Sequence, residues 1–374
     1  MKLMRFLTNV FCLLVGLLFI FSGFVKAVDP EGFAYKLTEY FLLDEFRFFL
    51  TDFLMESALI QSVLICAFEI FLGFVLVLRY NLRFWMKPIV IMMVFFTFLT
   101  GYSWIFDVVK ECGCFGNAIP LKAGQSFAKD IILMIILLPI YKLRKKIVPV
   151  FELTNHGTWI TISGGLLSIF ISVYGLLHLP LIDFRAYHEG ANIIEQMNDG
   201  KAAQIDYFYL MQKGPTEELI PASQYTQYAA DNWEMKNYQE RIIKPEIKPS
   251  IEDFSIIGQE DITQDILLRE DYYLFLISKH IEDANAEGLE AIAALSFDQT
   301  GIETIALTAS GDEEINAVKQ ATSLSFNFHT TDEKALATFI RSNPGLVLMK
   351  GDKIIKKWHH NDIPNQDELK ALTD

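Results

Sequence analysis

The fold is decided by a stretch near the start of the chain, residues 6–25, which reads FLTNVFCLLVGLLFIFSGFV. This stretch carries no charged side chain. A helix needs about 20 such residues to cross a bilayer core about 30 Å thick. The flanking sequences MKLMR and VKA also resemble the ends of a signal peptide, but the apolar stretch exceeds the usual signal core of about 7–15 residues. We therefore expect a retained transmembrane helix.

Further apolar runs follow at residues 59–78, 88–106 and 159–182, the first of them with a single carboxylate, Glu69. Residues 131–141 are also apolar but are too short to span unless residues 126–130 are included. That inclusion would place Lys129 and Asp130 near one membrane surface. We expect five transmembrane helices, so the lipid bilayer is the first partner of the chain.

Charge divides the 374 residues into two different parts. Residues 1–150 contain 15 Lys and Arg against 11 Asp and Glu, whereas the remainder contains 17 against 35, within an overall balance of −14. An apolar, slightly basic part followed by an acidic part indicates a membrane domain joined to a water-exposed domain. The pattern excludes a disordered chain, a disulfide-rich miniprotein and a single soluble domain. The acidic balance argues against nucleic-acid binding, because such a surface repels phosphate.

The short loops predict the orientation, because Lys and Arg gather on the cytoplasmic side of a membrane. Basic residues gather at positions 2–5, 79–87 and 142–146, whereas the loops at 29–56 and 107–125 are acidic or mixed. We therefore expect a bacterial inner-membrane protein with its N-terminus in the cytoplasm and everything after residue 183 in the periplasm.

The first external loop has a pattern of its own. Phe33, Leu37 and Tyr40 recur in it at helical spacing among polar residues. This spacing predicts an amphipathic helix that lies against the membrane or covers the bundle.

Two of the four cysteines form a motif. Cys12 and Cys66 lie in apolar spans, where cysteine usually behaves as a small hydrophobe. Cys112 and Cys114 lie in ECGCFGN, residues 111–117, in a loop that we expect to face an oxidising compartment. A bond between them closes a very tight ring, and departure from relaxed geometry favours a labile disulfide. The motif therefore predicts Cys112 and Cys114 as a redox pair.

Other interpretations of the motif stay open. A static disulfide would stabilise the fold little, because so short a loop loses little chain entropy. Pairing with Cys66 or with a thiol of another protein is a further alternative. For a metal site, two cysteines supply only half of a tetrahedral shell, and the nearest histidine in the sequence, His156, lies on the predicted cytoplasmic side. We therefore expect no metal.

Glu69 is the other candidate site residue of the membrane part. An ionisable group in the middle of a span is costly and by default marks a function in the bundle interior. The alternative is a structural ion pair with Lys26 or Lys129, either of which could reach in from the external edge.

From residue 251 onward strands alternate with helices, which predicts an α/β domain of the thioredoxin kind. The expected elements are a strand at 272–278, a helix at 285–295, a strand at 304–309, helices at 312–322 and 331–342, and a hairpin of 345–350 with 353–358. The expected domains are 1–147 for a four-helix membrane part, 148–183 for the fifth helix, 184–250 for a connecting subdomain with a strand at 205–214, and 251–374 for the α/β domain.

Several segments of the membrane part match a known pattern. They are FIFSGFVKAVDPEGF at 19–33, CGCFG at 112–116 followed by Pro120, Ser126-Phe127 and Lys129-Asp130, and Glu69 with Gly73 in the second span. With them, residues 1–145 resemble the MauE/DoxX-like membrane proteins. The resemblance implies a four-helix bundle that supports periplasmic thiol chemistry. MauE is associated with methylamine utilisation and with maturing a disulfide-rich dehydrogenase subunit. DoxX relatives accompany quinone-linked sulfur oxidation, so a quinone is the candidate cofactor by analogy, although no residue here identifies a site for one.

The second part resembles the thioredoxin-like domains of the TlpA type. Asn343-Pro344-Gly345 stands where those domains carry a proline, often in cis, that enters the hairpin, so the resemblance gives Pro344 a structural role. Those domains place Cys-x-x-Cys after the first core strand, where a helix start lowers the thiol pKa. Here that place reads SKHIED, residues 278–283, and no cysteine follows Cys114. The domain therefore cannot run dithiol exchange by itself, and His280 is better interpreted as a solvated loop residue than as a catalytic one.

These observations favour an integral membrane protein that supports periplasmic thiol–disulfide chemistry, or the maturation of partner proteins, through Cys112 and Cys114. Such a protein would be a subunit of a thiol–disulfide oxidoreductase, and its external domain would bind a periplasmic partner. The alternative is a non-enzymatic assembly factor or scaffold, in which the loop cysteines form a staple. A transporter comes last, because the sequence lacks internal repeats and clustered charges within the spans.

Overall fold

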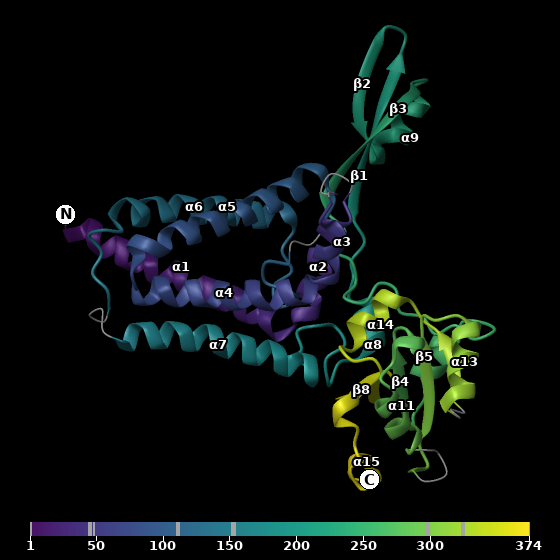
Figure 1. Cartoon of the computed structure of the whole chain (residues 1–374). Coiled ribbons are helices and arrows are strands. Elements are labelled where there is room, and N and C mark those ends of the chain that lie inside the picture. Colours follow the sequence, from purple (N-terminus) through teal and green to yellow (C-terminus); the bar gives the residue numbers. More distant parts are fainter. Residues whose placement is uncertain are drawn as a thin grey trace.

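Long helices lie side by side in the first half of the molecule (Figure 1). The structure is a computed structural model and describes residues 2–43, 47, 49–109, 113–150, 155–295, 300–322 and 326–373. Within this part of the chain, four helices are long and apolar enough to cross a membrane, which confirms the prediction of an integral membrane protein. They are α1 (Lys2–Val28), α4 (Ala58–Leu78), α5 (Leu82–Phe106) and α7 (Asn155–Leu177).

One further long helix, α6 (Ala123–Leu143), runs beside α5. It carries Lys129 and Asp130 near its start and is not among the four helices that meet the length and hydropathy criteria. The five-span arrangement therefore stays a prediction.

The chain reversals group the loops at the two ends of the bundle. The helices α1, α5 and α7 end, and α4 and α6 begin, at the end nearest the C-terminal sheet, which we call the domain-side end (Figure 1). The loops after α1 and after α5 therefore lie on the same side of the bundle as everything that follows α7, in agreement with the relative sidedness of the predicted loops. The compartment that this side faces stays a prediction.

Glycines let α1 and α4 approach each other closely. A Cβ atom on Gly73 would lie 2.8 Å from the carbonyl oxygen of Gly16, and a Cβ atom on Gly16 would lie 2.8 Å from that of Gly73. Only residues without bulk permit such contact between helix backbones. The bundle core that surrounds this contact consists of Cys12, Val15, Phe19, Leu72, Val75, Leu76, Leu82, Met86, Ile89, Met92, Met93, Leu133, Leu137 and Ile140.

The amphipathic helix predicted in the first loop is α2 (Pro30–Phe41), and α3 (Thr51–Glu56) follows it. The side chains of Phe33 and Leu37 are buried in one cluster with Cys66 of α4. The helix α2 therefore closes the domain-side end of the bundle as a packed lid.

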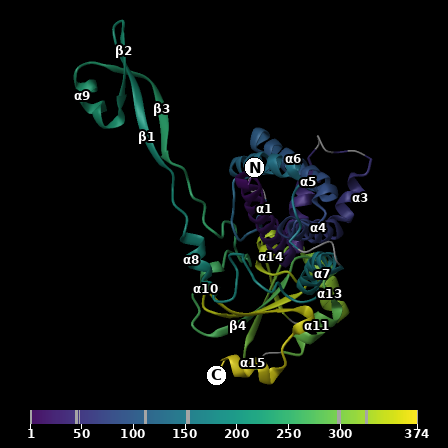
Figure 2. The same ribbon diagram turned by 90° about the vertical axis from the view of Figure 1, so that its left-hand side faces the viewer.

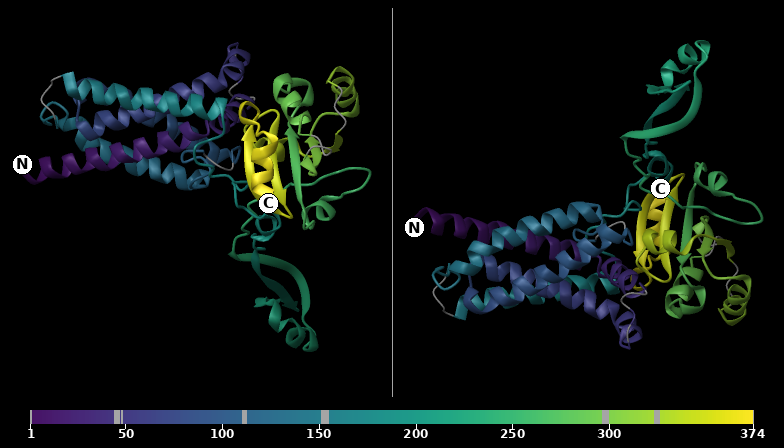
Figure 3. Two further views of the ribbon diagram at one scale, coloured as in Figure 1. Left: turned by 90° about the horizontal axis from the view of Figure 1, so that it is seen from below. Right: turned by 90° about the horizontal axis from the view of Figure 1, so that it is seen from above.

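A projecting arm separates the bundle from the C-terminal sheet in the sequence (Figure 2). Its strands pair antiparallel in the order β2-β1-β3 among the described residues, and every residue of β3 is exposed. The arm extends across the direction of the helices and away from the bundle (Figure 3). Its elements are β1 (Gln204–Lys213), β2 (Thr216–Pro221), η2 (Ala222–Gln224), α9 (Tyr225–Ala230) and β3 (Glu234–Lys244), and α8 (Ile193–Asn198) precedes them in the sequence.

The C-terminal part is an α/β domain, as predicted. Its sheet has the order β6-β5-β4-β7-β8 among the described residues, with β4, β5 and β6 parallel and with β7 and β8 added in antiparallel fashion. The elements are α10 (Thr263–Leu267), β4 (Tyr272–Ser278), η3 (Ile281–Asp283), α11 (Ala286–Ala293), β5 (Glu303–Thr308), α13 (Asp312–Thr322), β6 (Asn327–Thr330), α14 (Glu333–Phe339), β7 (Gly345–Lys350), β8 (Lys353–His359), η4 (His360–Asp362) and α15 (Gln366–Thr373).

The central strand β4 is buried on both faces, because its side chains alternate between two cores. Tyr273 and Phe275 belong to the core under α14, which also takes in Tyr187 and Ile193 from the segment after α7. Leu274 belongs to the other core, which is covered by α11, α13 and α15. The residues directly after the last bundle helix are thus part of the α/β core.

The α/β domain is held against the domain-side end of the bundle by polar contacts. Arg341, just after α14, forms an ion pair with Asp29 at the junction of α1 and α2, with Nε 2.8 Å from Oδ1. Lys279 donates a hydrogen bond of 3.0 Å to the hydroxyl of Tyr35 on α2. At the end of α7, the Nδ1 atom of His178 lies 2.8 Å from a carboxylate oxygen of Asp362.

Candidate functional site

The described part of the cysteine loop, residues 113–117, lies at the domain-side end and packs on α1 and α2. Cys112 falls outside the described residues, whereas Cys114 is described and half-buried. The hydroxyl of Ser22 on α1 donates a hydrogen bond of 2.7 Å to the carbonyl oxygen of Cys114. Gly113 has a φ of +62°, and a Cβ atom built on it would lie 3.3 Å from the side chain of Lys36 on α2. The loop is therefore held in a compact turn against the two helices rather than extended into solvent.

Glu69 is buried at the same end of the bundle and forms an ion pair with Lys26. The Lys26 side chain is only 3% exposed, and its ammonium group lies 5.2 Å from the ring centre of Phe33 and 5.1 Å from that of Phe96. Of the two lysines that the sequence offered as structural partners of Glu69, the structure selects Lys26. The carboxylate is thereby compensated inside the bundle, as a buried charge must be.

Lys129 has a carboxylate of its own. Its ammonium nitrogen lies 2.8 Å from Oδ1 of Asp130, and Oδ2 of Asp130 accepts a hydrogen bond of 3.0 Å from the hydroxyl of Thr100. The same ammonium group lies 5.1 Å from the ring centre of Phe115, the residue after Cys114. The arrangement therefore places a second lysine–carboxylate pair beside the cysteine loop, from α6 rather than from α1 and α4.

The segment after β4 lies beside the loop that contains Pro344, and the Asn343–Pro344 peptide bond is cis. The hydroxyl of Ser278 donates a hydrogen bond of 2.6 Å to Oδ1 of Asn343, and Nδ2 of Asn343 donates one of 2.9 Å to the carbonyl of His280. The Nε2 atom of His280 also lies 3.2 Å from Oε1 of Glu333. These groups form a hydrogen-bonded structural region that holds no sulfur.

Sequence reasoning missed the buried charges of the α/β domain. Lys357 is only 4% exposed, and its ammonium group donates hydrogen bonds to Asp183 (2.9 Å) and to the carbonyls of Tyr187 (2.8 Å) and Phe339 (2.5 Å). Burial lowers the pKa of Lys357 to about 7, with the nearby Arg185 guanidinium acting in the same direction and Asp183 against it. Only the alternation of β8, which turns Lys357 inward with His359, could have indicated this burial.

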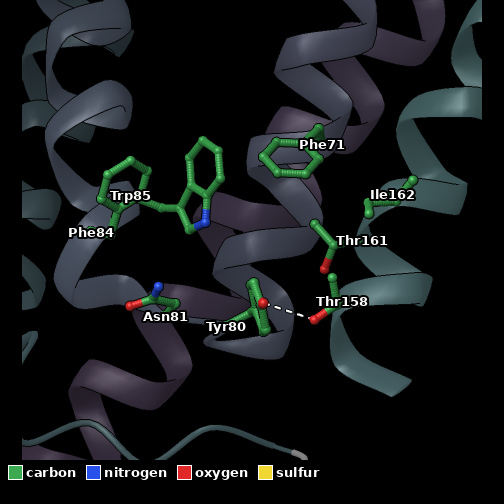
Figure 4. A pocket seen from close by; sticks show the side chains of 8 residues that line it. All are labelled: Phe71, Tyr80, Asn81, Phe84, Trp85, Thr158, Thr161 and Ile162. Carbon is green, nitrogen blue, oxygen red and sulfur yellow. Dashed lines mark hydrogen bonds between the residues drawn. The ribbon is translucent and has the colours of Figure 1, made fainter. Parts of the chain in front are cut away.

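Two cavities adjoin the bundle. One, of about 360 Å³, lies at the end opposite the domain-side end, where the Tyr80 hydroxyl is 2.7 Å from that of Thr158 and the Phe71 and Trp85 rings form the wall (Figure 4). The other, of about 440 Å³, is an apolar groove between α5 and α6, lined by residues that include Phe127. Within the described ranges, no group of three or more His, Cys, Asp or Glu residues is placed to hold a metal ion.

Comparison with known proteins gives one family for the membrane part. Residues 4–142 match the family model of the methylamine utilisation protein MauE. The matched region runs from α1 to α6 and contains the cysteine loop and both lysine–carboxylate pairs. No curated protein and no solved structure matches the chain.

Proposed function

We propose that the chain is a thiol–disulfide redox protein of the bacterial inner membrane, and that Cys112 and Cys114 are its working pair. The observation that carries the proposal is the hydrogen bond from Ser22 to the Cys114 carbonyl, beside the buried Lys26–Glu69 pair and the partly exposed Lys129–Asp130 pair. A structural disulfide needs no charged surroundings, whereas a reactive thiol works in an electropositive and partly exposed environment. The match of residues 4–142 to the MauE family supports this proposal.

The reaction would be a dithiol–disulfide exchange with a partner protein. One partner thiolate attacks a sulfur of the Cys112–Cys114 disulfide, forming a mixed disulfide and releasing the other cysteine as a thiolate. The second partner thiol then attacks the mixed disulfide, so the partner leaves oxidised and the pair is reduced by two electrons. A membrane quinone would reoxidise the pair by accepting two electrons and two protons. The apolar groove between α5 and α6, at the same end as the loop, is where such a ring would approach.

The α/β domain would position the partner over the cysteine loop. Its order of elements supports the thioredoxin-like assignment, with β4 followed by the SKHIED segment and with Pro344 before the hairpin. Since it has no cysteine, its contribution would be recognition, while electron transfer belongs to the bundle. In the proposed orientation of the chain, the N-terminus lies in the cytoplasm and the α/β domain lies in the periplasm.

A second candidate function is an assembly factor or scaffold that performs no redox chemistry. The projecting arm favours it, because every residue of β3 is exposed and the arm extends away from the bundle. Removal of the arm should abolish partner capture under this alternative and leave thiol cycling intact under the redox proposal.

Thiol trapping in whole cells tests the redox proposal. We expect Cys112 and Cys114 to be recovered in both reduced and oxidised forms, and a Cys114→Ser variant to accumulate mixed disulfides. Cys12→Ser is the matched control, because Cys12 is fully buried in the bundle core. This substitution should leave the trapping pattern unchanged. A pair that stays fully oxidised, together with silent Cys112→Ser and Cys114→Ser variants, would sink the proposal. A periplasm-reporting fusion at Asp374 tests the orientation and should be active.

A further inference from the structure

Lys26 of α1 and Lys129 of α6 both lie near the described part of the cysteine loop. Lys26 lies one turn after Ser22 on α1, so it shares a helix face with the residue whose hydroxyl holds the Cys114 carbonyl. Lys129 comes from α6 and lies over the ring of Phe115, next to Cys114. A negative charge on Cys114 would favour the charged form of both ammonium groups.

The carboxylates explain how the lysines keep their charge in this place. A lone ammonium group in an apolar interior would lose its proton, because burial penalises the charged form. Glu69 compensates Lys26, and Asp130 compensates Lys129. Each pair thus holds a permanent cation beside the cysteine loop.

Among the described residues, further charged and titratable groups near the loop come from α2 and α4. The Lys36 side chain of α2 would lie 3.3 Å from a Cβ atom built on Gly113, and its ammonium nitrogen is 3.1 Å from the carboxylate of Glu39. Cys66 of α4 is fully buried one turn before Glu69. The loop therefore meets cations from α1, α2 and α6, each with its own carboxylate partner.

We propose that Lys26 and Lys129 hold Cys114 as a thiolate whenever the Cys112–Cys114 pair is reduced. This inference rests on the proposed redox function and adds two positioning residues to it. Lys26 and Lys129 act on the reaction through the sulfur, by favouring its negative charge, and form no bond to the partner.

The protonation of the reduced pair follows. When a partner dithiol reduces the disulfide, two electrons pass to the pair and the partner becomes a disulfide. Of the two protons that the partner gives up, one binds to Cys112 and the other goes to solvent, because Cys114 remains a thiolate. Reduction by a protonated partner dithiol then becomes about tenfold more favourable for each unit of rising pH, whereas it would not depend on pH for a pair that takes up both protons.

Alkylation of Cys114 as a function of pH tests the proposal directly. The full-length Cys112→Ser chain, reduced in detergent, is exposed to iodoacetamide, and the modified Cys114 peptide is quantified by mass spectrometry. We expect Lys26→Met and Lys129→Met each to move the midpoint of the rate profile upward by about one pH unit, which is about tenfold slower reaction at pH values below both midpoints. Lys129→Arg should retain most of the wild-type profile, because it keeps the charge.

Matched controls separate this role from a purely structural one. Lys122→Met removes an exposed lysine at the start of α6 and should leave the profile unchanged. Because Lys26→Met leaves Glu69 buried and uncompensated, the isosteric double variant Lys26→Met/Glu69→Gln provides a second protein with both charges removed. It should still show an upward shift, no larger than that of Lys26→Met.

Profiles of the lysine variants that coincide with that of the Cys112→Ser parent would overturn the inference. Its failure can be told from failure of the redox proposal, because the alkylation profile does not depend on turnover. Shifted profiles in a protein whose pair never cycles in cells would retain the lysine role and remove the redox function. A pair that cycles in cells, together with unshifted profiles, would retain the redox function and remove the lysine role.

Discussion

Arg341 donates hydrogen bonds from Nε and Nη2 to both carboxylate oxygens of Asp29, at 2.8 and 2.9 Å, across 312 residues of sequence. This two-point contact joins the α/β domain to the junction of α1 and α2. The Arg341 side chain is only 7% exposed, so the pair is buried between the two parts of the chain. A guanidinium fork matches a carboxylate in shape as well as in charge, which makes the contact directional.

Replacing Arg341 by Gln should weaken the attachment of the domain, because Asp29 would remain as an uncompensated buried charge. The expected cost is about 3–5 kcal/mol. Amide hydrogen exchange should show this weaker attachment as faster exchange of the backbone amides of α2 and α14. Arg269→Gln is the matched control, since Arg269 pairs in the same manner with the exposed Asp271 and should cost about 1 kcal/mol or less. Equal protection in the two variants would contradict the role of Arg341.

The same contact should respond to acid. Burial by itself would raise the pKa of the Asp29 carboxyl, but the Arg341 guanidinium outweighs burial and lowers it to about 2. A carboxyl with a lowered pKa stabilises the folded chain fully above its unfolded value of about 3.9, and that stability is lost as the pH falls toward 2. The thermal midpoint of wild type should therefore fall between about pH 4 and pH 2 by more than that of Asp29→Asn. Parallel curves would contradict this assignment.

Glu69→Gln alone should destabilise the bundle, because the buried Lys26 would lose the carboxylate with which it pairs. We expect a loss of about 3–5 kcal/mol, and a recovery of most of it in Lys26→Met/Glu69→Gln, which restores neutrality at nearly constant volume. Thermal unfolding in detergent measures both. A double variant less stable than the single one would show that the pair stabilises the bundle beyond charge compensation.

Gly73→Ala should separate α1 from α4. The new Cβ atom would lie 2.8 Å from a backbone oxygen of Gly16, which cannot move as the end of a flexible side chain can. A cost of about 1–3 kcal/mol is expected for such overpacking. Gly165→Ala on α7 is the control, because its Cβ atom would make an ordinary contact at 3.6 Å. Similar thermal midpoints for the two variants would contradict the close approach.

The projecting arm should be dispensable for folding. Gln204 and Lys244 are paired at its base, so a short Gly-Gly link can replace residues 205–243 without stretching the chain. None of the residues removed belongs to the two cores that surround β4. The shortened protein should unfold within a few degrees of wild type, and a collapse of its thermal midpoint would mean that the arm supports the domain.

The sequence predicts best those elements that a single physical pattern determines. The strand at 272–278 is identical to β4, because a run of buried apolar residues bounded by polar ones permits little else. The short edge strand β6, Asn327–Thr330, was not predicted, since its residues are polar and only partly buried. The predicted helix at 331–342 is shorter as α14, because Ile340 already has extended dihedral angles.

The candidate site was predicted in part. The sequence indicates Cys114 and Glu69 by rarity alone, since a thiol motif in a loop and a carboxylate in a span both stand out against their surroundings. It could not choose between Lys26 and Lys129 as the partner of Glu69, because that choice depends on how α1 and α6 are placed around α4. Contacts such as that of Arg341 with Asp29 join distant segments and leave no local pattern to find.

The attachment of the last bundle helix restricts how the domain can move. The carbonyl of Leu177 accepts a hydrogen bond from Asn361, and six residues later Asp183 binds both Arg185 and Lys357 within the domain. The connection therefore does not act as a hinge, and the α/β domain is a rigid cap on the bundle. Because the domain cannot move out to bind a partner, the partner must be complementary in shape to this fixed cap.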